Sequence, residues 1–185
     1  MKICLVGSIL RHTIITDKGE YSGWGGMTES AIAPFAVLLN KDSTIYFVGS
    51  LGKDDIAELK EFYNKTYPIV DHSGIFINPT GTDLHVGTKH FVTRKIQVEP
   101  TKFERIEPYI HEVDAVIFNF GNIDDIDPEA IRLAKQNSKA LIYVDVHRKP
   151  FGADKEGRIY VRGWPGWENY LKFADHVQMN RQEAE

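Results

Sequence analysis

Short runs of apolar residues recur along the chain, and the intervals between them are long enough to hold a helix. Runs of four or five apolar residues, bounded by glycine or polar residues, are typical of strands buried in a sheet. The pattern therefore predicts five core strands: Ile3–Val6, Ile45–Val48, Ala115–Phe118, Leu141–Val144 and Val177–Met179.

Several intervening segments carry apolar residues at helical spacing. They predict helices at Thr28–Asn40, Asp54–Asn64, Pro128–Asn137 and Trp164–Ala174. Proline is favoured at a first helical position, and Asp127 before it is a suitable cap. Because strands and helices alternate, the sequence predicts an α/β fold with a mostly parallel sheet flanked by helices.

Two segments do not follow this alternation. Thr13–Trp24 contains a turn signal, Asp17-Lys18-Gly19, and Leu84–Val98 partly alternates and is rich in Val, Thr, Phe and His. One interpretation is a small antiparallel β-lid, built from about residues 13–24 and 84–98, over one edge of the sheet. The other is a pair of ordinary edge strands. Exposed lid strands would suit pairing with a second copy, so a homodimer through the lid is a candidate assembly.

Composition excludes several classes of protein. The 185 residues suit a single domain, 1–185, and the net charge of −4 argues against a nucleic-acid partner. The single cysteine, Cys4, rules out an internal disulfide and a cysteine-based zinc site. No apolar stretch approaches membrane-spanning length, so no membrane partner is expected and a cytoplasmic setting is the default.

Two glycine-containing segments precede predicted helices. Gly25-Gly26 would let a ligand approach the backbone, with free helix N–H groups beyond it, although a tight turn is an equal alternative. Gly49–Asp54 is interpreted as a compact strand-to-helix turn with a scaffold role. Neither segment matches the dinucleotide-binding or Walker fingerprints.

Polar residues follow two predicted strands near the carboxyl end of the chain. Asp145-Val146-His147-Arg148 comes after Leu141–Val144, where side chains face the ligand crevice of open α/β sheets. Asp145 and Arg148 could pair locally or face phosphate, and His147 could be a ligand or an ordinary loop residue. Asn180 and Glu183 have the spacing Asn-x-x-Glu, which suits a water-coordinated Mg²⁺ but also a helix cap.

In order, these four segments resemble the ribokinase-like (PfkB) family of carbohydrate kinases over nearly all of the chain. Residues 145–148 are similar to the family's Asp-Pro-Asn-x-Arg, and residues 180–183 to its Asn-x-x-Glu. The resemblance implies a β-lid over a sugar or related alcohol, ATP as donor and Mg²⁺ as cofactor. It implies a substrate side formed by Gly25, Gly26, Ser30 and His12. It implies a nucleotide and phosphate side formed by Asp145, Arg148, Asn180 and Glu183, with Asn180 and Glu183 holding Mg²⁺ through water.

The sequence departs from the family pattern in three places. His12 stands at or near the position of an early Asp that holds substrate hydroxyls, and Ser30 stands where an Asn closes the Gly-Gly motif. The Gly-Ala-Gly-Asp segment, which supplies the anion hole and the base, is absent, so no catalytic residue is assigned. We therefore expect the N-terminal part of a sugar kinase. The alternative is a non-catalytic sugar- or nucleotide-binding protein, or a degenerate remnant.

Overall fold

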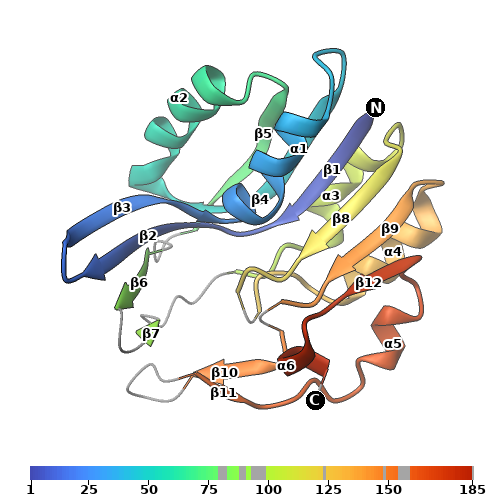
Figure 1. Ribbon diagram of the computed structural model, residues 1–185. Helices are drawn as coiled ribbons and strands as arrows, with labels where there is room; N and C mark the ends of the chain where they lie inside the picture. Colours follow the sequence, from blue (N-terminus) through green and yellow to red (C-terminus); the bar gives the residue numbers. More distant parts are fainter. Residues whose placement is uncertain are drawn as a thin grey trace.

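Six parallel strands form the central sheet, in the order β12-β9-β8-β1-β4-β5 (Figure 1). The computed structural model describes residues 1–78, 83–87, 91–92, 99–122, 124–147, 149–153 and 159–184. The strands are β1 (Lys2–Gly7), β4 (Thr44–Gly52), β5 (Val70–Asn78), β8 (Ala115–Asn119), β9 (Leu141–Asp145) and β12 (His176–Gln178). The prediction of an α/β fold with a parallel sheet is confirmed, and all five predicted strands belong to this sheet.

Helices cover both faces of the sheet because side chains alternate along each strand. Ile3 and Leu5 pack with the residues of α1 and α2, whereas Cys4 and Val6 pack with α3 and α4. Burial raises the pKa of the Cys4 thiol, so this cysteine stays protonated in the core. The helices are α1 (Ala33–Leu38), α2 (Ile56–Thr66), α3 (Phe103–Ile110), α4 (Glu129–Asn137), α5 (Glu168–Leu171) and α6 (Arg181–Ala184).

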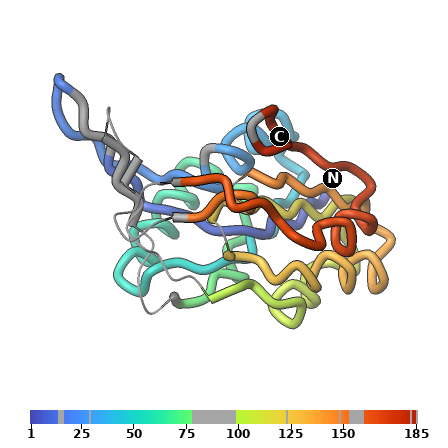
Figure 2. The backbone as a smooth tube through the Cα atoms, turned by 90° about the horizontal axis from the view of Figure 1, so that it is seen from below, coloured from blue at the N-terminus to red at the C-terminus, as the bar shows by residue number. Residues whose placement is uncertain are grey.

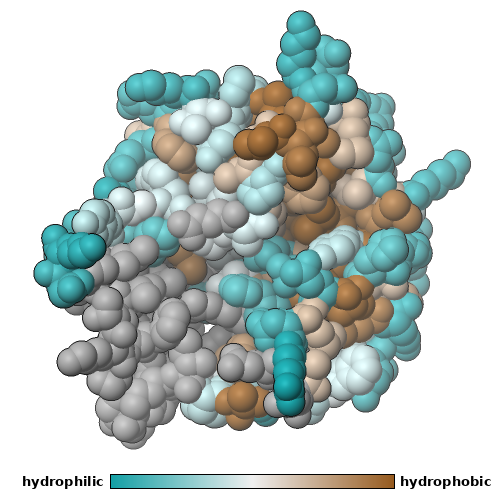
Figure 3. Space-filling model, viewed as in Figure 1, coloured by the Kyte–Doolittle hydropathy of each residue, from teal (hydrophilic) through white to brown (hydrophobic). Residues whose placement is uncertain are grey.

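Short helical turns precede two of these helices. A π-helical turn, η1 (Thr28–Ile32), leads into α1, and a 3₁₀ turn, η2 (Lys53–Asp55), leads into α2. The outer side of α1 is apolar: Val37 and Leu38 are 81% and 78% exposed, and Figure 3 shows hydrophobic side chains gathered over this helix. In the part of the chain that the structure describes, no helix is long and apolar enough to cross a membrane.

Some predicted boundaries were wrong. Gly49–Asp54 is not a compact turn, because β4 continues to Gly52 before η2 begins. The predicted helix Trp164–Ala174 is reduced to α5, since Pro165 and then Gly166, with φ +78°, interrupt its first turn. Met179 lies outside β12. The strand β5 and the helix α3 were not predicted at all.

A second sheet of four strands, in the order β3-β2-β6-β7, forms the lid. Its strands are β2 (Ile9–Thr16), β3 (Gly19–Gly26), β6 (Asp83–Gly87) and β7 (Phe91–Val92). The hairpin β2–β3 projects from the body of the molecule (Figure 2). The sheet is mixed, because β2 pairs with β3 in antiparallel fashion and with β6 in parallel. Residues 88–90 and 93–98 of the predicted lid segment lie outside the described residues.

Candidate functional site

The order of the central strands reverses between β1 and β8. From β1 the chain proceeds to β4 and β5 on one side, and later to β8, β9 and β12 on the other. Ligands of open α/β sheets bind beyond the carboxyl ends of the strands at such a switch point. The residues at this point are Gly7 at the end of β1, Ser8 directly after it, and Asn119 at the end of β8.

Gly26 and Ser30 lie together where the lid hairpin returns to the body. Gly26 has φ +62°, and a Cβ there would lie 2.7 Å from the carbonyl oxygen of Ser8. The Ser30 hydroxyl donates a hydrogen bond of 3.0 Å to the Gly26 carbonyl. The Met27 amide donates to the Ser8 carbonyl at 3.1 Å. The left-handed glycine thus fixes the beginning of η1 against the carboxyl end of β1.

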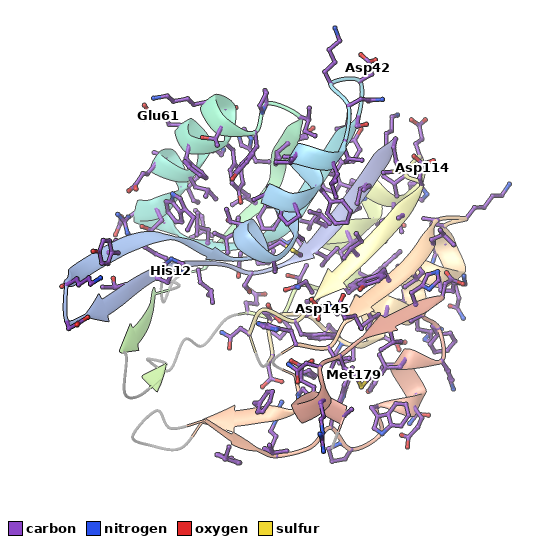
Figure 4. The ribbon with its side chains drawn as sticks, in the orientation of Figure 1. His12, Asp42, Glu61, Asp114, Asp145 and Met179 are labelled. Carbon is purple, nitrogen blue, oxygen red and sulfur yellow. The ribbon has the colours of Figure 1, made fainter. Side chains whose placement is uncertain are left out.

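The imidazole of His12 lies against two glycines of the neighbouring strand. A Cβ on Gly25 would be 2.4 Å from Nδ1 of His12, and one on Gly23 would be 3.2 Å from Nε2. Glycine at both positions leaves the room that the ring occupies. These contacts bring His12 together with Gly25, as the contact of the Ser30 hydroxyl brings Ser30 together with Gly26. His12 lies on the hairpin, whereas Asp145 lies at the carboxyl end of β9 (Figure 4).

Asp145 is half-buried at the end of β9. Its Oδ2 accepts a 2.7 Å hydrogen bond from the side-chain amide of Asn119. Burial raises the pKa of Asp145, while His147 and Asn119 act in the opposite direction. His147 follows with φ +37°, a backbone conformation that is uncommon for a residue with a side chain. Arg148, the remaining charged residue of this predicted motif, lies outside the described residues.

Asn180 and Glu183 form a reciprocal cap at the start of α6. The backbone amide of Asn180 donates a hydrogen bond to Glu183 Oε2 at 2.8 Å, and the backbone amide of Glu183 donates one to Asn180 Oδ1 at 3.1 Å. Glu183 Oε1 lies 3.9 Å from Nδ1 of His147, and the glutamate side chain is only 4% exposed. The helix-cap interpretation of Asn-x-x-Glu is therefore realised, and the cap holds the carboxylate beside His147.

The side chains at this end of the sheet offer oxygen atoms, which are the type of ligand that a hard cation prefers. Mg²⁺ prefers carboxylate oxygens together with water, and carboxylates are supplied by Asp145 at the end of β9 and by Glu183 in α6, where Glu183 contacts the amide of Asn180. Each Glu183 oxygen accepts a hydrogen bond from Asn180 and keeps acceptor capacity, since a carboxylate can accept about four hydrogen bonds. Among the described residues there is no cluster of three or more His, Cys, Asp or Glu side chains suited to binding a metal directly.

A cavity of about 380 Å³ lies beside Glu183. Its lining is mainly apolar and aromatic: Val146, Pro150, Val161, Gly163, Trp164, Trp167, Leu171, Met179 and Ala184. Lys149, which is almost buried, lies 5.7 Å from the ring of Trp164 and donates a hydrogen bond of 2.9 Å to Asp124. The hairpin of β10 (Phe151–Ala153) and β11 (Ile159–Val161) contributes Val161 to one side.

Sequence reasoning missed the polar residues at the switch point itself. Asp125 is fully buried, and its Oδ2 accepts hydrogen bonds from the backbone amides of Ser8 at 3.2 Å and Asn122 at 3.0 Å. Burial raises the pKa of Asp125 to about 7. The sequence does hold a signal for the polar residues of the switch point, because Ser8 and Asn119 closely follow two predicted core strands.

Comparison with known proteins gives no match to any family model and no match to a curated protein. Solved structures do match. A pyrophosphate-dependent kinase in the ribokinase family, complexed with a pyrophosphate analog and myo-inositol, superposes with a TM-score of 0.80 at 16% identity. The match covers 99% of this chain and 62% of that one.

Two further structures agree. An uncharacterized sugar kinase from Pyrococcus horikoshii has a TM-score of 0.68 at 19% identity, covering 100% of this chain and 64% of that one. Ribokinase from Thermotoga maritima has a TM-score of 0.66 at 17% identity, covering 99% and 60%. This chain thus spans less than two thirds of the length of each of these proteins. By its strand order, its lid and these superpositions, the chain has the ribokinase-like fold.

Proposed function

We propose that this protein is a relative of the PfkB carbohydrate kinases and binds a sugar or related alcohol between the lid and the carboxyl ends of β1 and β8. In its complete form it transfers phosphate from ATP to a hydroxyl of that acceptor. The observation that carries the proposal is the position of Gly26 and Ser30 at the topological switch point, where the lid hairpin meets β1.

On the acceptor side, Gly25 and Gly26 present backbone and Ser30 and His12 present polar side chains. Gly25 has a second role, because its missing side chain leaves room for the imidazole of His12. An imidazole can donate or accept a hydrogen bond from a hydroxyl, so His12 suits the acceptor alcohol chemically. Its place on the lid means that lid closure would bring it to the acceptor.

On the phosphate side, we assign Asp145, Arg148, Asn180 and Glu183 to the donor. The carboxylates, with the Asn180 amide, would hold Mg²⁺ through water, and bound Mg²⁺ would neutralise charge on the phosphates. The reciprocal cap orients Glu183 in advance, because both of its oxygens already accept hydrogen bonds from Asn180. Several of the matched structures are of pyrophosphate-dependent kinases, so pyrophosphate belongs beside ATP in any test of the donor.

A second candidate is a sugar- or nucleotide-binding protein without catalysis. His12 and Ser30 favour it, because they replace the Asp and Asn that the resemblance leads one to expect at the acceptor. No residue of the chain is assigned as the base that would take the proton of the acceptor hydroxyl. Binding and turnover must therefore be measured separately.

Calorimetric titration with ribose, myo-inositol, fructose and nucleosides tests acceptor binding, and consumption of ATP or pyrophosphate with Mg²⁺ tests transfer. We expect saturable binding of one acceptor class, weakened at least about tenfold by Ser30→Ala, and no appreciable turnover by the 185-residue chain. Lys41→Ala, on the loop after α1, is the control for binding. Absence of binding by any sugar or polyol contradicts the proposal, and robust turnover abolished by Glu183→Ala would show that a complete site exists.

We also propose a homodimer through the lid. In the described sheet β3 is an outer strand, and Tyr21 on it is 56% exposed. Light scattering at rising concentration should show a dimer that Tyr21→Lys disrupts. Leu38→Lys, on the apolar outer side of α1, is the matched control, and loss of the dimer in this variant alone would assign the interface to α1 instead.

A further inference from the structure

The helix α2 contacts both of the elements that carry the proposed acceptor side chains. Ser30 lies in the π-helical turn η1, and His12 lies on the lid strand β2. A side chain of α2 is bonded to a residue of each of these elements. The helix is therefore placed to control how the lid and the turn stand relative to each other.

The turn η1 is held to α2 by a buried hydrogen bond. Oγ1 of Thr28 and the hydroxyl oxygen of Tyr63 are 2.8 Å apart, and both residues are buried. Burial raises the pKa of Tyr63, so its hydroxyl stays protonated. Met27 and Ile32 pack in the same hydrophobic cluster as Tyr63. Because π-helical turns are rare and often occur at functional sites, the bond at Thr28 holds an uncommon backbone form beside Ser30.

The lid strand β2 is held to the first turn of α2 by a forked ion pair. Nη1 and Nη2 of Arg11 donate hydrogen bonds of 2.8 and 3.3 Å to the two carboxylate oxygens of Glu58. Nη1 also donates to Asp55 at 3.1 Å. The guanidinium carbon lies 5.4 Å from the centre of the ring of Trp24, which is directly opposite on β3. A forked arginine–carboxylate pair has a defined geometry, so Glu58 orients the base of the lid.

Aromatic side chains connect these two attachments. Trp24 and Phe62 line one cavity of about 290 Å³ together with Arg11 and Glu58. The ring centres of Phe62 and Tyr63 are 5.8 Å apart. The cavity leaves room for the Trp24 ring to shift when the ion pair is released. A continuous path of neighbouring side chains therefore leads from the lid to the turn η1.

We propose that α2 positions the acceptor site as one unit, in which Glu58 sets the lid strand that carries His12 and Tyr63 sets the turn that carries Ser30. Both are positioning residues, since they act on the acceptor through other groups. Release of one attachment loosens the other, because both use the same helix and the same aromatic side chains. The effect on the acceptor rests on the proposed function, whereas the coupling between lid and turn belongs to the folded chain and is measured without a ligand.

Fluorine NMR of protein labelled with fluorinated tryptophan tests the coupling, with the Trp24 resonance assigned through Trp24→Phe. Glu58→Gln should shift this resonance, and Tyr63→Phe should shift it as well. Glu61→Gln changes an exposed acid on the same helix (Figure 4) and is the control for the first variant. Tyr67→Phe, in the same ring cluster, is the control for the second. An unchanged Trp24 resonance in Tyr63→Phe overturns the proposal.

Hydrogen exchange of the η1 amides gives the reciprocal readout. Glu58→Gln should speed their exchange by about fivefold, although Glu58 is attached to the lid. The combined variant Glu58→Gln/Tyr63→Phe should then show a non-additive effect on these amides. Additive effects would mean that α2 holds two independent elements, contrary to the proposal.

Removing both partners of the buried hydrogen bond separates positioning from stability. Tyr63→Phe alone leaves the Thr28 hydroxyl without this partner, whereas Thr28→Val/Tyr63→Phe removes both polar groups. The double variant should regain the unfolding midpoint of the native chain and keep the altered Trp24 resonance. Recovery of the resonance together with the midpoint would assign the bond to stability alone and refute the positioning role.

Calorimetry with ribose and myo-inositol tests the link to the acceptor. Where the native chain binds one of them, Glu58→Gln and Tyr63→Phe should each weaken binding by about fivefold, and Glu61→Gln should not. Equal affinity in all of these variants contradicts the positioning of the acceptor. Binding of neither compound by the native chain counts against the proposed function, and the fluorine and exchange measurements still decide the coupling.

Discussion

The side-chain amide of Asn119 donates a hydrogen bond to the carboxylate of Asp145, and so joins the carboxyl ends of β8 and β9. The two residues are directly opposite in the parallel ladder. Burial raises the pKa of Asp145, and the bond from Asn119 favours the ionised form against that effect. A residue overlooked in the sequence therefore acts, together with His147, on the charge of one that was singled out.

Asn119→Ala should raise the pKa of Asp145 further, because the carboxylate loses a donor while remaining half-buried. Carbon-detected NMR of the Asp145 carboxyl group during a pH titration measures the change. Asn137→Ala removes an amide that bonds only the Leu133 carbonyl on α4, and should leave the titration unchanged. A downward shift in Asn119→Ala would contradict the assigned role.

Asp125 should make the stability of the protein depend on pH. Its folded pKa of about 7 lies above its ordinary value of 3.8, so the folded state holds the proton more tightly than the unfolded chain. The stabilisation is complete below about pH 4 and is lost as the pH rises towards 7, by on the order of a few kcal/mol. Urea unfolding at constant ionic strength from pH 4 to 8 measures the slope. Asp125→Asn should flatten it, and an unchanged slope in that variant would assign it to other groups.

Gly26→Val should lower stability as well as block the acceptor site. Valine would have to adopt φ +62°, and its Cβ would lie 2.7 Å from the Ser8 carbonyl oxygen. Such strain costs roughly 1–3 kcal/mol, so this substitution does not isolate binding from folding. Denaturant midpoints show the loss, and Gly121→Ala, whose added methyl group meets only ordinary contacts of 3.4 Å or more, is the unstrained glycine control. Equal midpoints for the two variants would argue against the left-handed role of Gly26.

Gly25→Ala should act through His12. Its Cβ would lie 2.4 Å from Nδ1, so the imidazole must leave its place on the strand. The substitution should weaken acceptor binding in the native background and have little further effect when His12 is already alanine. A double-mutant cycle measures this coupling, and additive effects would show that the two residues act independently.

The inner strands were predictable because Ile3–Val6, Ile45–Val48 and Ala115–Phe118 are largely buried on both faces, which leaves continuous apolar runs. The strand β5 was not predicted, for the opposite reason. It forms the edge of the sheet and begins with Val70 followed by Asp71, His72 and Ser73, so its first half is polar. The helix α3 was missed because it is only 8 residues long and contains Pro108.

The candidate site was predictable only where local sequence sets local geometry. Gly25-Gly26 and Asn180–Glu183 act on their immediate neighbours, and the structure shows both as compact local motifs. Asp125 acts on the backbone of Ser8, which is 117 positions away in the chain. No spacing rule joins such residues, since only the pairing of β1 with β8 brings them together.

The strand pairs of the lid join segments that lie at very different separations along the chain. The hairpin β2–β3 closes through a two-residue turn, whereas β2 meets β6 only after the whole β4–α2–β5 unit has intervened. Long-range pairing costs chain entropy that a hairpin avoids, so the hairpin can form first and β6 must wait for the body. Hydrogen exchange should then find the β6 amides less protected than those of β3. Damage to β5, which leads directly towards β6, would open the lid without touching any residue of the site.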